Sequence, residues 1–201
     1  MRCEMCDMRI LPKSFYNRNT LQVAQDLLGC FLVILPNGKS PATNGAHANS
    51  AKRISKFKIV EVEAYNGPYD LASHASRGWT KRNSVMFGQP GIIYVYFTYG
   101  MHYMLNIVTE RKDYPAAILI RAVELESGNG PARLTKALKI DKSFNGLPIY
   151  TKKYGLWIES RAKNEKLQII KTKRIGVDYA GKYKDKKWRF YIRDNKFVSK
   201  K

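Results

Sequence analysis

Acidic residues and cysteines are both scarce in this chain of 201 residues. Only 16 aspartates and glutamates balance 36 lysines and arginines, which leaves a formal net charge of +20. A charge of this size attracts polyanions, so it favours nucleic acid as the partner over an anionic membrane surface or an acidic protein. The three cysteines, Cys3, Cys6 and Cys30, are too few for a disulfide framework and indicate a reducing compartment.

Motifs for metals and nucleotide cofactors are also missing. Cys3 and Cys6 form one CxxC, but no second CxxC or CxxH follows at the spacing of a zinc site. The sequence contains no P-loop, no GxGxxG after a strand-like run, no HExxH and no GxSxG. We therefore expect neither a metal nor a nucleotide cofactor.

Long uncharged runs are limited to residues 83–109, which could by length cross a bilayer. This stretch includes Pro90, His102, Asn106 and four tyrosines, which would be costly to place in hydrocarbon. The first ten residues are charged and lack the apolar core of a signal peptide. We expect no membrane contact and interpret residues 83–109 as the lining of an aromatic cleft.

The hydrophobic pattern predicts an α+β fold. Helical patterns cover residues 20–28 and 131–140, whereas strand-like runs are more numerous and cover residues 30–35, 57–65, 91–99, 104–108, 116–125, 169–177 and 188–193. The runs follow one another like hairpins instead of alternating with helices, which indicates a largely antiparallel sheet. We expect a single domain over residues 11–201, with a loose tail at residues 1–10 and a flexible loop at residues 41–53.

Two glutamates alternate in the strand-like run FKIVEVEAY. Because alternate residues of a strand point to the same face, Ile59, Glu61, Glu63 and Tyr65 are expected to share one face. A half-exposed sheet edge would explain this face, and so would an acid–base pair whose protonation is tuned by burial. The alternation does not decide which of the two carboxylates acts.

One charge, Arg121, interrupts the apolar run AILIRAV. A buried guanidinium requires a facing anion, so Arg121 is expected to form either a structural salt bridge or a pair with Glu63 beside an attacking water. Aromatic side chains gather around these positions in the sequence. Ordinary packing or stacking on an unpaired base would explain the group, which comprises Tyr65, Tyr94, Tyr96, Tyr99 and Tyr103 near His74 and His102.

The chain resembles the alkyladenine (3-methyladenine) DNA glycosylase family in five segments, which are VEVEAYNGPYDLASHASRG, RNSVMFGQPGIIYVYFTYGMHYMLNIV, AILIRAVE, GPARLTKAL and RIGVDYAGKYKDKKWRFYIR. They occur in the family's order, and the resemblance extends from about Leu11 to Ser199. It implies a compact α+β domain with a curved, largely antiparallel sheet and no cofactor. It also implies removal of alkylated or deaminated purines, such as 3-methyladenine, 7-methylguanine, hypoxanthine and ethenoadenine.

The resemblance assigns the catalytic roles to three positions. Glu63 corresponds to the family's catalytic base, and Arg121 to the arginine that helps to hold the attacking water. The main chain at Ile175 corresponds to a further contact of that water.

Five more positions correspond to residues that bind the damaged nucleotide. Tyr65 and His74 would sandwich the flipped base, with Tyr96 closing one side of the pocket. Asn106 would clash with the amino group of guanine. Tyr99 would wedge into the space that the base vacates.

These assignments imply a monofunctional enzyme that binds double-stranded DNA containing damaged purines and acts as a monomer. No lysine occupies a nucleophile position of the family, so we expect no Schiff base and no strand cleavage. The protein would be intracellular, with the DNA: in the nucleus of a eukaryote, or in the cytoplasm or nucleoid of a bacterium. The alternative is a non-catalytic basic nucleic-acid-binding protein, which would explain the charge and the aromatics but not Glu63 and Arg121 beside them.

Overall fold

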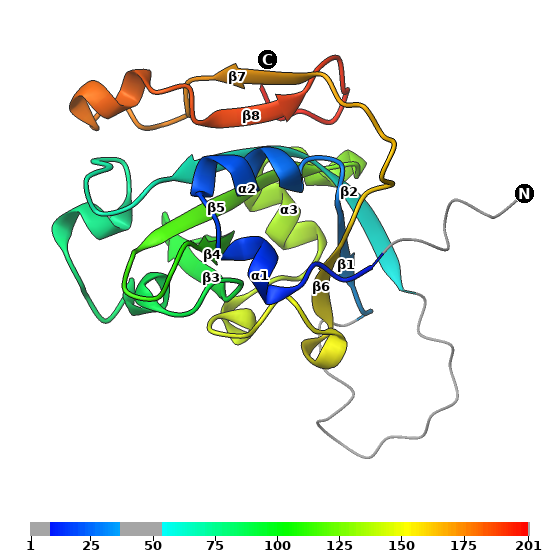
Figure 1. Cartoon of the computed structure of the whole chain (residues 1–201), viewed down its shortest axis with the longest axis horizontal. Coiled ribbons are helices and arrows are strands. Elements are labelled where there is room, and N and C mark those ends of the chain that lie inside the picture. Colours follow the sequence, from blue (N-terminus) through cyan, green and yellow to red (C-terminus); the bar gives the residue numbers. More distant parts are fainter. Residues whose placement is uncertain (1–8, 37–53, 201) are drawn as a thin grey trace, which may run out of the picture.

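The computed structural model describes residues 9–36 and 54–200 (Figure 1). Its strands are β1 Phe31–Ile34, β2 Ser55–Tyr65, β3 Ile93–Thr98, β4 His102–Thr109, β5 Ala116–Val123, β6 Leu156–Glu159, β7 Ile169–Thr172 and β8 Arg189–Ile192. Its α-helices are α1 Lys13–Tyr16, α2 Thr20–Leu27 and α3 Pro131–Ala137. Short 3₁₀ helices cover His74–Arg77, Ser84–Phe87, Glu126–Gly128, Lys142–Phe144, Lys152–Tyr154 and Gly181–Asp185.

The strands form an eight-stranded sheet in which every pair is antiparallel, so the predicted α+β class with a largely antiparallel sheet is confirmed. The main path runs β3-β4-β5-β2-β1-β6. One edge of β2 pairs with β5. The opposite edge is shared by two strands, since β1 pairs with the first half of β2 and β8 with the second half. The β7–β8 hairpin lies above α2 and β2 in the view of Figure 1.

Strand β2 is therefore an interior strand, and the half-exposed edge considered for it is wrong. Residues 59–64 are all buried. The predicted alternation is correct for Glu61, Glu63 and Tyr65 but wrong for Ile59. A β-bulge shifts the register with β5 between Ile59 and Val62, and Ile59 packs into the same core cluster as Val62.

Both predicted helices are present and their ends have local causes. The side chain of Asn19 caps α2 by accepting the backbone N–H groups of Leu21 and Gln22. Pro131 occupies the first turn of α3, where the missing N–H is not needed. Helix α3 ends at Ala137, three residues before the end of the helical pattern predicted for residues 131–140. Both helices pack against the sheet, α2 on β2 and β5, and α3 on β4 and β5.

The uncharged stretch 83–109 forms a 3₁₀ helix and the β3–β4 hairpin. No helix within residues 9–36 and 54–200 has the length and apolar character needed to cross a membrane. The predicted loop 41–53 and residues 1–8 of the predicted tail lie outside the described residues. Arg9 and Ile10, the last two residues of that tail, pair with Ser160 and Glu159 at the end of β6.

Candidate active site

A cavity of about 490 Å³ lies between the β2–β5 sheet and the loops that follow β2 and β7. Its volume is in the range of pockets that bind small organic ligands. Seven of the eight residues predicted for the site line it, namely Tyr65, His74, Tyr96, Tyr99, Asn106, Arg121 and Ile175. The eighth, Glu63, is fully buried and contacts three of the lining residues.

Glu63 lies at the floor of this cavity, directly behind the lining residues Tyr65, Arg121 and Ile175, with both carboxylate oxygens engaged. Its Oε1 accepts the backbone N–H of Ile175 at 2.8 Å and lies 3.3 Å from Nη1 of Arg121. Its Oε2 accepts the hydroxyl of Tyr65 at 3.0 Å. Burial and the charge of Glu63 hold the pKa of Tyr65 well above its ordinary value, so the phenol stays protonated and donates.

Glu61, on the same face of β2, lies in a different environment. Its Oε1 accepts Nε of Arg121 at 2.9 Å and Nε of Arg189 at 2.8 Å, and its Oε2 accepts the backbone N–H of Ser199 at 2.7 Å. Neither carboxylate is itself a lining residue, but all three partners of Glu63 line the cavity, whereas Arg121 is the one partner of Glu61 that does. The geometry thus separates the two carboxylates that the alternation could not distinguish.

Arg121 touches both carboxylates and is itself buried. Burial opposes its charge, but Glu63 and Glu61 outweigh burial and hold its pKa above the ordinary value. The expected facing anion is present twice, so the prediction that a carboxylate faces this arginine is confirmed.

Aromatic rings form the walls of the cavity. The ring centroids of His74 and Tyr96 lie 4.5 Å apart at an interplanar angle of 72°. Nδ1 of His74 is 3.1 Å from the hydroxyl of Tyr94, a lining residue without a predicted role. Loss of hydration in the cavity wall and the nearby charges of Arg82 and Arg77 lower the pKa of His74, which favours a neutral imidazole.

Asn106 is fixed by the strands themselves. Its Nδ2 donates to the carbonyl oxygens of Tyr94 and Met104, each at 3.2 Å. The side chain is buried and borders the cavity. Its orientation is therefore set by the β3–β4 backbone.

Tyr99 is at the tip of the β3–β4 hairpin and is 83% exposed. Tyr99 (φ 52°) and Gly100 (φ 67°) are the central residues of a tight turn in which the backbone N–H of Met101 donates to the carbonyl of Thr98, within the three-residue loop that joins the strands. The turn presents the ring to solvent beside the cavity mouth.

Sequence reasoning missed the support behind Tyr65. The guanidinium of Arg174 lies 4.9 Å from the Tyr65 ring centroid and makes two hydrogen bonds, of 2.5 and 2.8 Å, to the buried carboxylate of Asp70. Arg174 stands among lysines in KTKRIGV, so its sequence gave no signal. Arg189, by contrast, interrupts the run WRFYIR much as Arg121 interrupts its own run, and that signal could have found it.

No group of three or more histidine, cysteine, aspartate or glutamate side chains in the described part of the chain could hold a metal ion. The charged groups at the cavity floor are instead the carboxylate of Glu63 and the guanidinium of Arg121, which pair with one another. Such an arrangement can hold and deprotonate a water molecule.

The chain is similar to known proteins along most of its length. A family model described as Methylpurine-DNA glycosylase (MPG) matches residues 14–129 and 126–196. Three relatives carry the name "Putative 3-methyladenine DNA glycosylase". The protein of Legionella pneumophila (strain Corby) is 41% identical over 198 residues, which cover 96% of this chain and 100% of the relative.

The other two come from Methanocella arvoryzae and Clostridium perfringens (strain SM101 / Type A). The first is 42% identical over 213 residues, covering 96% of this chain and 98% of the relative. The second is 39% identical over 217 residues, covering 95% and 99%. The chain belongs to the methylpurine-DNA glycosylase family.

Proposed function

We propose that this protein flips alkylated or deaminated purines out of double-stranded DNA and hydrolyses their N-glycosidic bond with a water activated by Glu63. The observation that carries the proposal is the buried carboxylate of Glu63, held by Arg121 and Ile175 at the floor of an aromatic cavity. Family membership and the relatives' names support the same activity.

Capture of the damaged nucleotide begins at the hairpin tip. Tyr99 enters the duplex from the minor groove and fills the space that the nucleotide leaves. The base rotates into the cavity between Tyr65 and His74, with Tyr96 at one side. A damaged base is already poorly paired, which lowers the cost of flipping. A cationic alkylated purine also gains about 1 kcal/mol from cation–π attraction to tyrosine.

Hydrolysis follows at C1′ of the flipped nucleotide. Glu63 takes a proton from a water held with Arg121 and the main chain at Ile175, and the resulting hydroxide adds to C1′. The C1′–N bond breaks and its electron pair leaves with the base. The transition state has oxocarbenium character, which the negative charge of Glu63 stabilises. The products are a free base and an abasic site.

Selection against guanine depends on Asn106. Its side chain is held rigidly by two backbone carbonyls, so it cannot turn away from the 2-amino group of guanine. The proposed substrates are 3-methyladenine, hypoxanthine and ethenoadenine, which lack this amino group, and 7-methylguanine, which carries it and gains instead from the attraction of its positive charge to tyrosine. The enzyme works as a monomer, requires no metal or nucleotide cofactor, has no lyase activity and acts in the compartment that holds the DNA.

The decisive experiment is incubation of the protein with duplexes that each carry one of these bases, read out as abasic sites in a single turnover. Glu63→Gln should slow base release by at least about 100-fold, because a general base contributes on this scale. Binding to a duplex with an abasic-site analogue should remain. Glu126→Gln, a change at an exposed glutamate, is the matched control.

Borohydride trapping in the same reactions should give no protein–DNA adduct, and a robust adduct would mean a lyase. If wild type binds DNA but releases none of the bases, the protein is a non-catalytic DNA-binding protein instead.

A further inference from the structure

Glu61 has no role in the hydrolysis described above, yet it forms the centre of a buried charge cluster. Glu61 and Glu63 are fully buried, and the side chains of Arg121 and Arg189 are 10% and 5% exposed. The cluster contains equal numbers of positive and negative charges. A buried ion pair of this kind is a weak stabiliser, since desolvation offsets its attraction, so its presence calls for another explanation.

The contacts of Arg121 suggest that explanation. Its Nε donates to Glu61 at 2.9 Å, and its Nη2 donates to Oγ of Ser199 at 3.4 Å. One edge of the guanidinium is therefore occupied by Glu61 and the C-terminal segment. Only Nη1 faces Glu63, at a long distance of 3.3 Å.

An arginine and a carboxylate frequently pair through two parallel hydrogen bonds. Such a pair between Arg121 and Glu63 would occupy both oxygens of the base and oppose its protonation. Glu61 prevents that pair by binding the Nε edge of the arginine. It is itself fixed by Arg189 from β8 and by the backbone N–H of Ser199.

We propose that Glu61 is a positioning residue that holds Arg121 away from a two-point pair with Glu63 and so keeps Glu63 available as the base. This inference rests on the proposed function, because it assigns no chemistry to Glu61 itself. The charged and titratable groups nearest to Glu63 are Arg121 from β5, Tyr65 from β2 and Tyr96 from β3, and Arg189 of β8 lies opposite Glu63 in the strand pairing.

Two variants test the role. Glu61→Gln removes the charge of Glu61 and weakens its hold on Arg121. The double variant Glu61→Leu with Arg189→Met removes one charge of each sign, so the cluster stays neutral and the exchanged side chains are apolar, a replacement that buried ion pairs often tolerate. In both, Arg121 is free to pair with Glu63.

Both variants should release base several-fold to about tenfold more slowly in a single turnover at pH 7, because Glu63 is a weaker base beside a closer guanidinium. The acid side of the pH–rate profile should move down by about one pH unit. Affinity for a duplex with an abasic-site analogue should stay within about twofold of wild type, since none of the exchanged residues lines the cavity.

Glu159→Gln is the matched control. Glu159 is another buried glutamate, bound to Lys56 and to the indole of Trp157, and it lies in β6 outside the cavity lining. Its exchange should lower stability without changing the rate per folded molecule or the pH profile.

The outcomes separate the two proposals. Wild-type rate and an unshifted pH profile in the folded double variant, or rate losses that only follow the unfolded fraction seen by circular dichroism, would overturn the role of Glu61. Failure of wild type to release any base, or full activity of Glu63→Gln, would overturn the proposed function itself.

Discussion

Two glutamates two residues apart on one strand illustrate how environment assigns chemistry. Glu61 accepts hydrogen bonds from two guanidinium groups and one backbone N–H, and it is closed off from the cavity. The partners of Glu63 are the cavity's own lining residues, Tyr65, Arg121 and Ile175. The two side chains are identical, but their partners differ, so Glu61 is proposed as a support and Glu63 as the base.

His74 gives a pH-dependent test at the same scale. Partial dehydration, Arg82 and Arg77 lower its pKa, so it is neutral at pH 7 and charges only below its ordinary value of 6.5. A protonated His74 repels a cationic base such as 7-methylguanine. The wild-type rate of 7-methylguanine release, divided by that of His74→Gln, should therefore fall as the pH drops from 7 to 5.

The ratio of the two release rates on one substrate cancels every pH dependence of hydrolysis that the two proteins share. A ratio that stays flat over this range would mean that His74 does not face the bound base.

At the scale of secondary structure, the sequence predicted most of the elements that build the site. Alternation placed Glu61, Glu63 and Tyr65 on one face, and the lone charge in β5 pointed to a buried ion pair. The bulge at Ile59 was not predictable, because it depends on how β2 pairs with β5, more than 50 residues away. Helix α1 and strand β6, each of four residues, were not predicted, because neither lies in an apolar or alternating run as long as the ones around β1, β7 and β8.

The long-range contacts of the site were beyond local patterns for the same reason. Glu61 meets Arg189 across 128 positions of the chain, and Asp70 meets Arg174 across 104. Only the assembled sheet brings these groups together. The sequence could thus show that charges would be buried, but not which partners neutralise them.

The Asp70–Arg174 pair makes a prediction about the loops that follow β2 and β7. Both side chains are fully buried, and Arg174 stands directly before Ile175 and lies against Tyr65. Asp70→Asn leaves an uncompensated guanidinium in the interior, which should lower the free energy of unfolding by roughly 3 kcal/mol in urea titrations.

The control is Asp185→Asn, which breaks the exposed pair of Asp185 with Lys173 and should leave the urea midpoint unchanged. Equal midpoints for wild type and Asp70→Asn would show that the buried pair does not hold the two loops.

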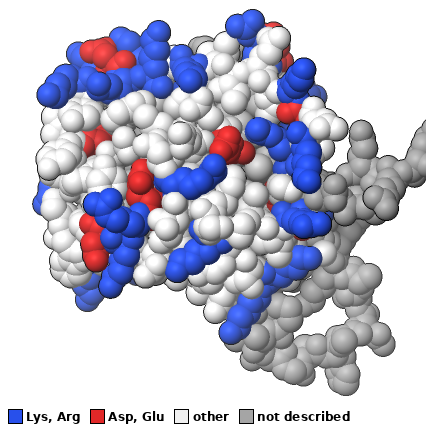
Figure 2. All heavy atoms as spheres, in the orientation of Figure 1, with Lys and Arg blue, Asp and Glu red and all other residues white. Residues whose placement is uncertain are grey.

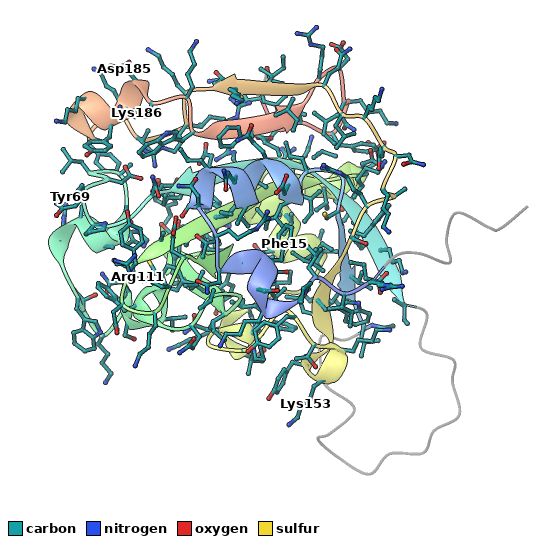
Figure 3. All side chains as sticks on the ribbon, in the orientation of Figure 1. Phe15, Tyr69, Arg111, Lys153, Asp185 and Lys186 are labelled. Carbon is teal, nitrogen blue, oxygen red and sulfur yellow. The ribbon has the colours of Figure 1, made fainter. Side chains whose placement is uncertain are left out.

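At the scale of the whole molecule, charge is unevenly distributed. Residues 161–201 contain 15 of the 36 lysines and arginines but only four acidic residues. Figure 2 shows basic side chains gathered at the upper left of the view, where Figure 3 labels Lys186 beside Asp185. Asp185 ends a basic 3₁₀ helix, Gly181–Asp185, and Lys186 follows it. The helix comes shortly after Tyr179, an exposed residue that lines the cavity. If the proposed function is correct, this placement predicts that its lysines contact DNA phosphates next to the flipped nucleotide.

Exchange of the exposed lysines Lys182, Lys184 and Lys186 for glutamine should therefore weaken DNA binding and its salt dependence together. Each phosphate contact contributes about 0.9 to the slope of log K against log salt concentration, so the loss of all three should reduce the slope by up to about 2.7. Base release at saturating protein should not change, because these side chains do not line the cavity.

A control triple exchange at Lys13, Lys142 and Lys152 removes the same charge from exposed positions on elements that do not line the cavity. If both triple variants lose the same slope, attraction to DNA comes from the net charge of +20 as a whole. A larger loss for the first triple variant would instead locate the phosphate contacts beside the cavity, because counterion release counts only the phosphates that lysines actually neutralise.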